Sequence, residues 1–510
     1  MKFNKQKLFS TLLTFLFLFI LYRFSNVSEL NTLFINANIK RIEVSPTNSE
    51  DYRQYLMKYS PSDLGIPENQ LNCLEPALLE SDSYNLQEKT IEIKEAISDV
   101  TLLFEVLKYS YAGYLYFGNE EKWETAKNNI LNQINAYPEK LSVFTLQQIL
   151  IKNLYFIKDN HFLINNTPML NHEDYYYNQT FTIQQDSRGF YLYVNTQKWY
   201  IESIEGDPNV EQYIKPSLDK SGSRCNYIGI LSTHPYTAVT LKLNSGRDSK
   251  EIHVKLEKST GKIYNEIQLS EAYSSKKINN IPIFSMRSFI GTNNLTVYQE
   301  SAKYAKGKDL IILDLRGNSG GQTTIPATWF ESFTGQMPKT NHIDIRLANL
   351  INNYVTKKSL KIIDYENLTP YFKNLYEIES DIATQTKNQW YITKEKKVVL
   401  PNTTKIFVLI DKNVASSAEW FVESLDTLKN VVFVGTNTSG CTLSKQSIRC
   451  TLPYSKLTVT YGDTISINDI EEGRGFEPDI WIPADYQFIT KRKMKQIQKK
   501  VSGDKTLLYF

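Results

Sequence analysis

The chain has 510 residues, which is enough for more than one domain. Its 58 basic and 55 acidic residues nearly cancel, and the formal net charge is +3. This balance gives no argument for nucleic acid or another strongly charged partner, and a hydrophobic content of 41% is sufficient for buried cores.

The first 24 residues predict a targeting segment. Lys2, Lys5 and Lys7 precede an apolar run over residues 8–22, which is short against the roughly 20 residues that span a membrane. This pattern is typical of a secretory signal peptide, and an uncleaved membrane anchor over residues 8–22 is the alternative. With either one, we expect the remaining chain to be extracytoplasmic, secreted or attached to the cell membrane.

The next segments differ in their apolar pattern. Residues 25–86 are polar and rich in proline, so we expect a connecting segment with little regular structure. Over residues 87–170, apolar side chains such as Ile93, Ile97 and Val100 recur at helical spacing, which predicts a helical domain.

Residues 171–275 predict a β-rich domain, because short runs of aromatic and β-branched residues follow one another. Residues 201–208 resemble a strand and turn of a PDZ domain, but the usual carboxylate-binding loop is not apparent. A PDZ-like domain and a generic small β domain are equal alternatives. The chain as a whole is therefore predicted to be an α+β multidomain protein.

Strands and helices alternate over residues 281–490, which predicts a layered α/β core. An insertion over residues 336–401 interrupts this pattern. Its length is typical of a lid or substrate-facing arm, and a peripheral decoration is the alternative. Residues 491–510 form a basic tail.

The sequence leaves open whether the four cysteines form disulfide bonds. They allow three complete disulfide pairings, between which the sequence does not choose. Free buried thiols are an equally good interpretation. These residues are Cys73, Cys225, Cys441 and Cys450.

Three separate segments of the α/β region carry residues suited to an active site. Residues 311–321 predict a buried strand that ends in a glycine loop. A second predicted strand is followed by Ala-Ser-Ser-Ala-Glu at residues 415–419, and residues 472–479 are Glu-Gly-Arg-Gly-Phe-Glu-Pro-Asp. The order and spacing of these segments resemble the core of the tail-specific (C-terminal-processing) serine peptidases and of the related tricorn protease. The resemblance implies a serine peptidase that acts on peptides or proteins.

Ser416 is the candidate nucleophile. It starts a predicted helix after a buried strand, where N–H groups and the helix dipole favour developing negative charge. The family motif resembles Ser-Ala-Ser-Glu, and Glu419 aligns its first serine with Ser416. The alternative is a helix-capping box, which requires no catalysis.

The resemblance also implies an oxyanion hole made by backbone N–H groups of Gly320, Gly321 and Ser417. Glycines allow such groups to approach a substrate carbonyl closely. The alternative is a tight strand-to-helix turn. We expect Asp314 and Arg316 to be structural.

The general base departs from the commoner family pattern. Tail-specific peptidases use a Ser-Lys dyad, and at the position of that lysine this chain has Cys441. Tricorn-like relatives instead use a His that is oriented by a Glu. His161 in Asp-Asn-His and Glu472 match those positions, so the resemblance implies a Ser416–His161–Glu472 triad. A structural role for His161 is the alternative.

No motif for a metal or cofactor is present, such as Cys-x-x-Cys, His-Glu-x-x-His or a phosphate-binding glycine loop. We therefore expect neither a metal nor a cofactor. The leading interpretation is an extracytoplasmic serine peptidase with a Ser nucleophile and a His base. A catalytically inactive, peptide-binding member of the same family is the alternative, which Cys441 favours. A cell-surface adhesion or scaffolding protein explains the motifs least well.

Overall fold

The computed structural model describes residues 27–42, 52–59, 66–77, 89–219, 224–259, 272–278, 280–290 and 295–483. Helices and sheets are both extensive, which confirms the predicted α+β fold class. The predicted targeting segment, residues 1–24 with the apolar run 8–22, and the basic tail 491–510 lie outside the described residues. None of the helices in the described part of the chain is long and apolar enough to cross a membrane.

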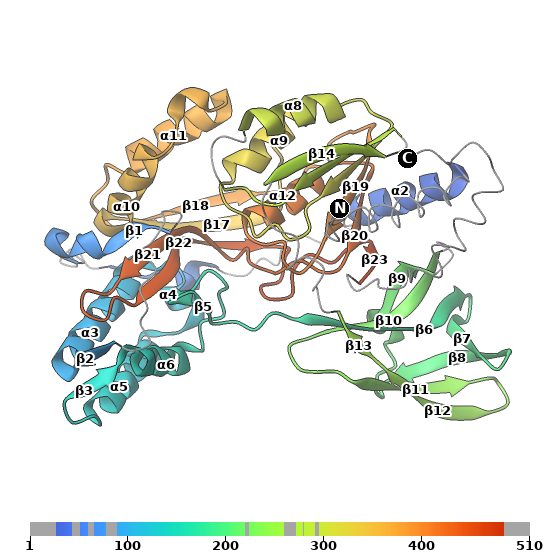
Figure 1. The fold of residues 1–510 in the computed structure, drawn as a ribbon, viewed down its shortest axis with the longest axis horizontal. Helices are drawn as coiled ribbons and strands as arrows, with labels where there is room; N and C mark the ends of the chain where they lie inside the picture. The colour runs from blue at the N-terminus through green and yellow to red at the C-terminus, as the bar shows by residue number, and fades with distance from the viewer. Residues whose placement is uncertain are drawn as a thin grey trace, which may run out of the picture.

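A six-stranded sheet forms the centre of the α/β core (Figure 1). Its strands follow the order β14-β15-β16-β19-β20-β23, and all neighbours are parallel except β14 and β15. Strands β16 and β19 are almost wholly buried apolar residues, as expected for parallel strands covered on both faces. The strands are β14 (Tyr273–Ile278), β15 (Ile281–Met286), β16 (Leu310–Asp314), β19 (Lys405–Ile410), β20 (Val431–Gly435) and β23 (Ile480–Trp481).

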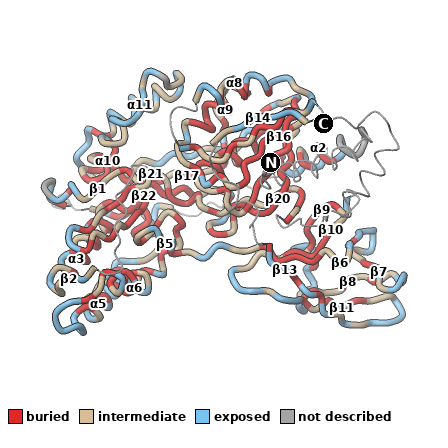
Figure 2. Tube along the Cα trace, viewed as in Figure 1, coloured by how far each residue is buried: buried red, intermediate tan, exposed pale blue. Residues whose placement is uncertain are grey.

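Helices cover both faces of this sheet. Alternate residues of β16 point to opposite sides, so Ile311 and Leu313 lie in one hydrophobic cluster and Ile312 in another. The first cluster includes α8, α9 and α12, and the second includes α2. Figure 2 shows that the strands of this sheet are largely buried, as are parts of the second sheet and of the helical region. The helices are α2 (Val27–Ile42), α8 (Leu295–Ala305), α9 (Thr324–Thr334) and α12 (Ser417–Leu425).

Helix α2 corrects the expectation of little regular structure between residues 25 and 86. Its residues Leu33, Phe34 and Ala37 are buried against the sheet, and the Phe34 ring centroid lies 5.2 Å from that of Phe407. Packing against a distant strand stabilises this helix, and the polar, proline-rich composition of the segment gave no sign of it. The rest of the described segment holds the 3-10 helices η1 (Tyr52–Tyr55) and η2 (Glu68–Cys73) and strand β1 (Leu74–Pro76).

A second, seven-stranded sheet connects the α/β core to the helical region. Its order is β1-β21-β22-β17-β18, β4 pairs with β22 and β5, and all its pairs are antiparallel. Strands β17 and β18 come from the insertion 336–401, which thus contributes two strands to this sheet. The choice between a substrate-facing arm and a peripheral decoration stays a prediction. The strands are β4 (Leu163–Ile164), β5 (Thr167–Pro168), β17 (His342–Ala348), β18 (Gln389–Glu395), β21 (Ser444–Thr451) and β22 (Thr458–Asn468); the insertion also holds η5 (Tyr365–Asn367), α10 (Leu350–Lys361) and α11 (Pro370–Ile382).

The helical region packs on this second sheet. Apolar residues of its helices, including Leu103 and Leu150, share one core with Val459 and Tyr461 of β22. Asn119 and Ser142 cap α5 and α6 through their side chains, which explains where these helices begin. The elements are β2 (Thr90–Glu92), α3 (Ile93–Ser110), α4 (Tyr114–Phe117), α5 (Glu120–Asn135), β3 (Lys140–Ser142) and α6 (Val143–Leu154).

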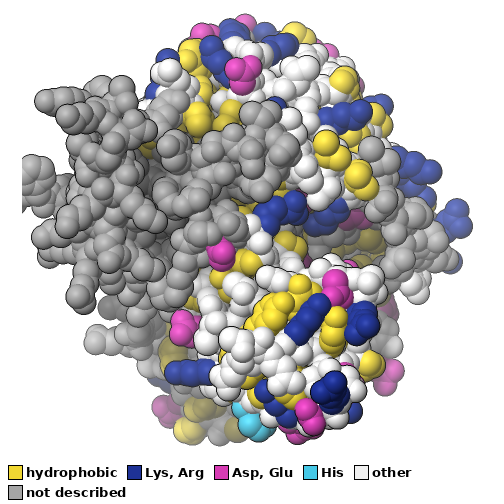
Figure 3. Space-filling view, turned by 90° about the vertical axis from the view of Figure 1, so that its right-hand side faces the viewer, with side chains coloured by type: hydrophobic (Ala, Val, Ile, Leu, Met, Phe, Trp, Pro, Cys, Tyr) yellow, Lys and Arg dark blue, Asp and Glu magenta, His cyan; other side chains and the backbone are white. Residues whose placement is uncertain are grey.

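Residues 174–258 form an antiparallel sheet with a core of its own. Its order is β12-β11-β8-β7-β6-β10-β9, with β13 paired to β6. Figure 3 shows the end of the molecule that includes this sheet, where basic, acidic and hydrophobic side chains are interspersed and no single charge dominates. The elements are β6 (Asp174–Asp186), β7 (Gly189–Val194), β8 (Gln197–Ile204), η3 (Val210–Tyr213), β9 (Ile214–Leu218), β10 (Arg224–Ser232), β11 (Ala238–Asn244), β12 (Ser249–Lys255) and β13 (Glu257–Lys258). The choice between a PDZ-like and a generic β domain, like the exact domain boundaries, stays a prediction.

Candidate active site

Ser416 lies in the turn between β19 and α12 and is the N-cap residue of α12. Its backbone has φ 55° and ψ −124°, a conformation that residues other than glycine rarely adopt. Such strain costs about 1–3 kcal/mol and persists only where the surroundings impose it. A strained strand-to-helix turn also exposes the nucleophilic serine of α/β-hydrolases, so the backbone suits the predicted nucleophile.

Glu419 holds this turn in place. It is fully buried, and its Oε2 accepts hydrogen bonds from the amides of Ser416 at 3.2 Å and Cys441 at 2.7 Å. Its Oε1 accepts from the Gly440 amide at 2.7 Å and from the Thr438 hydroxyl. Burial raises the pKa of Glu419 to about 7, although these four donors favour the carboxylate. The Ser-x-x-Glu motif thus fixes the Ser416 backbone and joins it to the loop that carries Cys441.

His161 meets Ser416 across 255 residues of sequence. Its Nε2 lies 3.1 Å from the Ser416 Oγ. His161 follows α6 and precedes β4, whose pairing with β22 fixes this loop. Burial lowers the pKa of His161, and the opposing effect of Asp159 is smaller. A neutral imidazole protonated on Nδ1 can accept the hydroxyl proton at Nε2.

Asp159 fixes the backbone beside the imidazole. It is fully buried, and its Oδ1 accepts the His161 amide at 2.8 Å. Its Oδ2 accepts the hydroxyls of Tyr111, at 2.8 Å, and Ser444. Sequence reasoning missed Tyr111, because it stands in a run of tyrosines that indicates only core packing. Its pairing with Asp159 could not be found without the fold.

Glu472 lies next to His161 but contacts the backbone rather than the ring. Its Oε1 accepts the Asn160 amide at 2.8 Å, and its Oε2 accepts the amides of Thr442 at 3.0 Å and Leu443 at 2.9 Å. Burial and Asp159 raise the pKa of Glu472 to about 8, against these three donors. Among the described contacts, none joins Glu472 to the imidazole. Any orienting effect would therefore act through Asn160, and the catalytic role of Glu472 stays a prediction.

Cys441, which the sequence comparison aligns with the family lysine, lies beside the imidazole. Its Sγ lies 3.6 Å from both ring nitrogens of His161. Burial, with Glu472 and Glu419 nearby, raises the pKa of this thiol well above its ordinary value, so the side chain is uncharged at neutral pH. Lys445 does not replace the missing lysine, because its Nζ pairs with Asp344 at 2.9 and 3.0 Å.

The glycine loop approaches Ser416 closely. A Cβ on Gly320 would lie 2.7 Å from the Ala415 oxygen and 3.0 Å from both the Ser416 Cβ and the Ser417 nitrogen. However, the Gly320 amide already donates to the Asn318 Oδ1 at 2.9 Å. Within the described residues, the amides of Gly321 and Ser417 have no acceptor. The amides of Gly321 and Ser417 are thus free to donate, whereas the Gly320 amide is engaged. The oxyanion hole of Gly320, Gly321 and Ser417 stays a prediction.

Buried charge pairs anchor the same loop. Asp314 bonds to Arg287 and Arg316, which hold its pKa well below the usual range despite burial. Asp411 accepts the Gly317 amide at 3.0 Å. Asp314 and Arg316 therefore make structural contacts.

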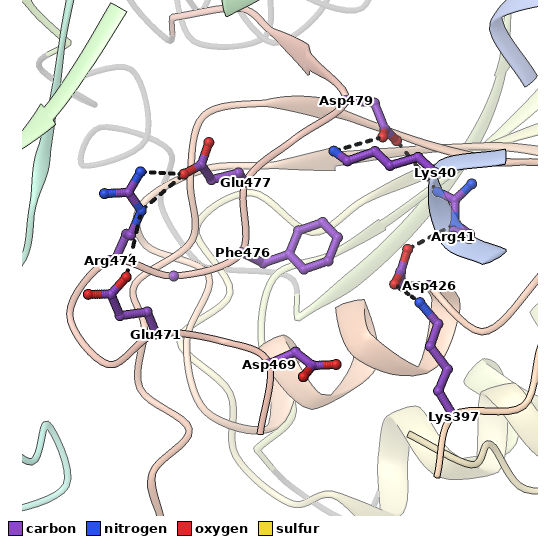
Figure 4. A pocket seen from close by; sticks show the side chains of 11 residues that line it. Lys40, Arg41, Lys397, Asp426, Asp469, Glu471, Arg474, Phe476, Glu477 and Asp479 are labelled. Carbon is purple, nitrogen blue, oxygen red and sulfur yellow. Dashed lines mark hydrogen bonds and ion pairs between the residues drawn. The ribbon is translucent and has the colours of Figure 1, made fainter. Parts of the chain in front are cut away.

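A separate cavity of about 310 Å³ lies between the end of α2 and residues 471–479 (Figure 4). Figure 4 shows that most of its charged side chains are paired, with Arg41 and Lys397 bonded to Asp426 and Arg474 bonded to Glu477. In the described residues, no group of three or more His, Cys, Asp or Glu side chains could hold a metal ion.

Comparison with known proteins gives a family for the region that carries Ser416. Residues 280–482 match the family model described as peptidase family S41. No curated protein matches the chain.

Several solved structures are similar to the chain at a low level. Mature CPAF is 13% identical with a TM-score of 0.41, over 80% of this chain and 96% of that one. The photosystem II D1 C-terminal processing protease is 12% identical with a TM-score of 0.34, over 76% and 94%. The tricorn protease is 11% identical with a TM-score of 0.31, over 81% and 37%. The family resemblance therefore depends on residues 280–482, the region that matches the model of peptidase family S41.

Proposed function

We propose that the protein is an active serine peptidase in which Ser416 is the nucleophile and His161 the general base. The observation that carries this proposal is the distance of 3.1 Å between the Ser416 Oγ and the His161 Nε2. This distance is within hydrogen-bond reach, which proton transfer requires. The strained backbone of Ser416 and the free amides beside it support the same assignment.

The proposed reaction begins when the Ser416 Oγ attacks the carbonyl carbon of a peptide bond and its proton moves to the His161 Nε2. The amides of Gly321 and Ser417 donate to the resulting oxyanion. His161 then gives the proton to the leaving amine, and a water molecule hydrolyses the acyl-enzyme by the reverse sequence. A positioned base contributes roughly 10²–10⁴ in rate, and one oxyanion donor about 10²–10³.

The catalytically inactive, peptide-binding alternative depends on Cys441. An uncharged thiol does not supply the base of a Ser-Lys dyad. On our proposal Cys441 does not have to act as a base, because His161 is the base and Cys441 only packs against its ring. Asp159 holds the His161 backbone, and Glu472 is proposed to hold it through Asn160.

The test is labelling by a fluorophosphonate probe together with peptide hydrolysis. The wild type should be labelled, and Ser416→Ala should lose both labelling and hydrolysis while its circular dichroism is unchanged. Ser417→Ala is the matched control, because it keeps the backbone amide and should keep labelling.

Two further variants separate the candidate bases. His161→Ala should reduce hydrolysis by about 10²–10⁴, whereas Cys441→Ala should retain most of it. A folded wild type that is neither labelled nor active would favour the peptide-binding alternative. If Ser417→Ala lost labelling and hydrolysis while Ser416→Ala kept both, Ser417 and not Ser416 would be the nucleophile.

We also propose that the chain after residue 24 is extracytoplasmic, where it acts on peptides or proteins. The basic residues before the apolar run 8–22 support this location. Fractionation of the native host should recover the protein in a membrane or extracytoplasmic fraction. Recovery only from the soluble cytoplasm would contradict the proposal.

A further inference from the structure

Two of the four cysteines contact each other away from His161 and Ser416. Cys73 is the last residue of η2, and Cys450 lies in β21. Their Sγ atoms are 3.8 Å apart, although 377 residues separate them in the sequence. Both are free thiols in this structure.

The backbone on each side holds these sulfurs together. Strand β1 begins directly after Cys73 and pairs with β21, so that Leu74 lies opposite Cys450 and Pro76 opposite Ile448. The Nζ of Lys358 donates to the Leu74 oxygen at 3.0 Å and supports β1 from the other side. The pairing of β1 with β21 therefore holds the backbone of Cys73, directly before β1, close to that of Cys450.

The two thiols differ in access. Cys450 is fully buried, whereas Cys73 is partly exposed. The Cys450 thiol donates to the Cys73 sulfur, and this hydrogen bond lowers the pKa of Cys73. An external disulfide can thus reach Cys73 first, and the thiolate is the attacking form in disulfide exchange.

We propose that Cys73 and Cys450 form a disulfide bond when the protein meets an oxidising disulfide, such as glutathione disulfide. The Cys73 thiolate attacks one sulfur of the oxidant and releases one thiolate, which leaves a mixed disulfide on Cys73. The Cys450 sulfur then attacks the Cys73 sulfur, loses its proton to solvent and releases the second oxidant thiol. The protein loses two electrons and two protons, and the oxidant is reduced to two thiols.

Formation of this bond requires only a small movement. The sulfurs must approach from 3.8 Å to about 2 Å, which rotation of the side chains can supply. The bond would fix β1, a three-residue strand at the edge of the seven-stranded sheet, to β21. It would also close a loop between residues 73 and 450 that contains both His161 and Ser416, and so restrict the unfolded chain.

The direct test is peptide mapping of the purified full chain. The protein is equilibrated in glutathione buffers from reducing to oxidising, then denatured, alkylated and digested. In oxidising buffer we expect a peptide that links Cys73 to Cys450, with Cys225 and Cys441 alkylated. In reducing buffer all four cysteines should be alkylated.

Two variants make the test specific. Cys73→Ser should abolish the linked peptide, whereas Cys225→Ser, the matched control, should keep it. The thermal midpoint of the wild type and of Cys225→Ser should rise on oxidation, and that of Cys73→Ser should not change. Four alkylated thiols in oxidising buffer, glutathione retained on Cys73 alone, or a link to Cys225 or Cys441 would each overturn the proposal.

Discussion

The position of the imidazole depends on side chains that do not touch Ser416. The Tyr111 hydroxyl donates to Asp159, and Asp159 in turn accepts the His161 amide. Both Tyr111 and Asp159 are buried, so no water competes for these bonds. On the proposed mechanism, Tyr111 is therefore a positioning residue that acts on His161 through the Asp159 carboxylate and the His161 amide.

We expect Tyr111→Phe to lower kcat about 10-fold, which corresponds to the loss of one hydrogen bond to a charged group. KM should stay the same, because Tyr111 has no part in substrate binding. Steady-state kinetics measures both constants. The control is Tyr155→Phe, at a half-exposed tyrosine nearby in sequence, which should leave both unchanged. A rise in KM at constant kcat would show that Tyr111 does not act through His161.

On the proposed mechanism, the pH dependence of hydrolysis reports the protonation state of His161. The base must be neutral, so activity is lost as pH falls through its pKa. Since burial lowers that pKa, the acid limb of kcat/KM should have its midpoint below pH 6.5, the usual value for histidine. The pH profile of the wild type measures this midpoint. A midpoint above 6.5 would mean that Asp159 outweighs burial or that another group is the base.

At the scale of elements, α2 covers part of one face of the six-stranded sheet. Phe34 is 2% exposed and packs on Phe407, whereas the neighbouring Ile35 is 55% exposed. Truncation of a buried Phe costs about 3–5 kcal/mol. We expect Phe34→Ala to lower the free energy of unfolding by this amount and Ile35→Ala to leave it nearly unchanged, as measured by denaturant titration. Equal effects of the two variants would show that α2 does not dock as described.

The sequence predicted those helices and strands whose apolar pattern is visible within the segment itself. Buried strands such as β16 and β19 were predicted from apolar runs, and the helical region from the spacing of Ile93, Ile97 and Val100. The sequence did not reveal α2, or the incorporation of β17 and β18 into a sheet, because those elements depend on partners far away. Strand β17, for example, pairs with β22 more than 100 residues later along the chain.

For the candidate site too, the sequence predicted some features and not others. Ser416, His161 and Glu472 could be selected because each lies in a motif that resembles a family segment. The sequence could not predict which atoms of these residues contact each other. The Gly320 amide is engaged by Asn318, and Glu472 is engaged by backbone amides, and both contacts follow from folded geometry.

At the scale of the whole molecule, acids whose pKa is raised in the folded state contribute to the pH dependence of stability. Burial, with Glu419 nearby, raises the pKa of Glu423 in α12 to about 8. The folded state thus keeps a proton that the unfolded chain releases near pH 4.5. Stability from this group is complete below pH 4.5 and is lost as pH rises through about 8.

We therefore expect the thermal midpoint to fall between pH 6 and pH 9, and to fall less in Glu423→Gln. Differential scanning calorimetry at several pH values measures both. Glu121→Gln, at an exposed position in α5, should keep the slope of the wild type. An unchanged slope in Glu423→Gln would assign the pH dependence to other groups.

The distance in sequence between His161 and Ser416 has a consequence for the growing polypeptide. Contacts within the helical region are largely local and can form early, whereas a contact across 255 residues requires closure of a long loop. During synthesis His161 therefore emerges from the ribosome long before Ser416. On the proposed mechanism, a chain whose synthesis is incomplete has no peptidase activity. Hydrolysis begins only after the C-terminal strands have paired with the rest of the sheet.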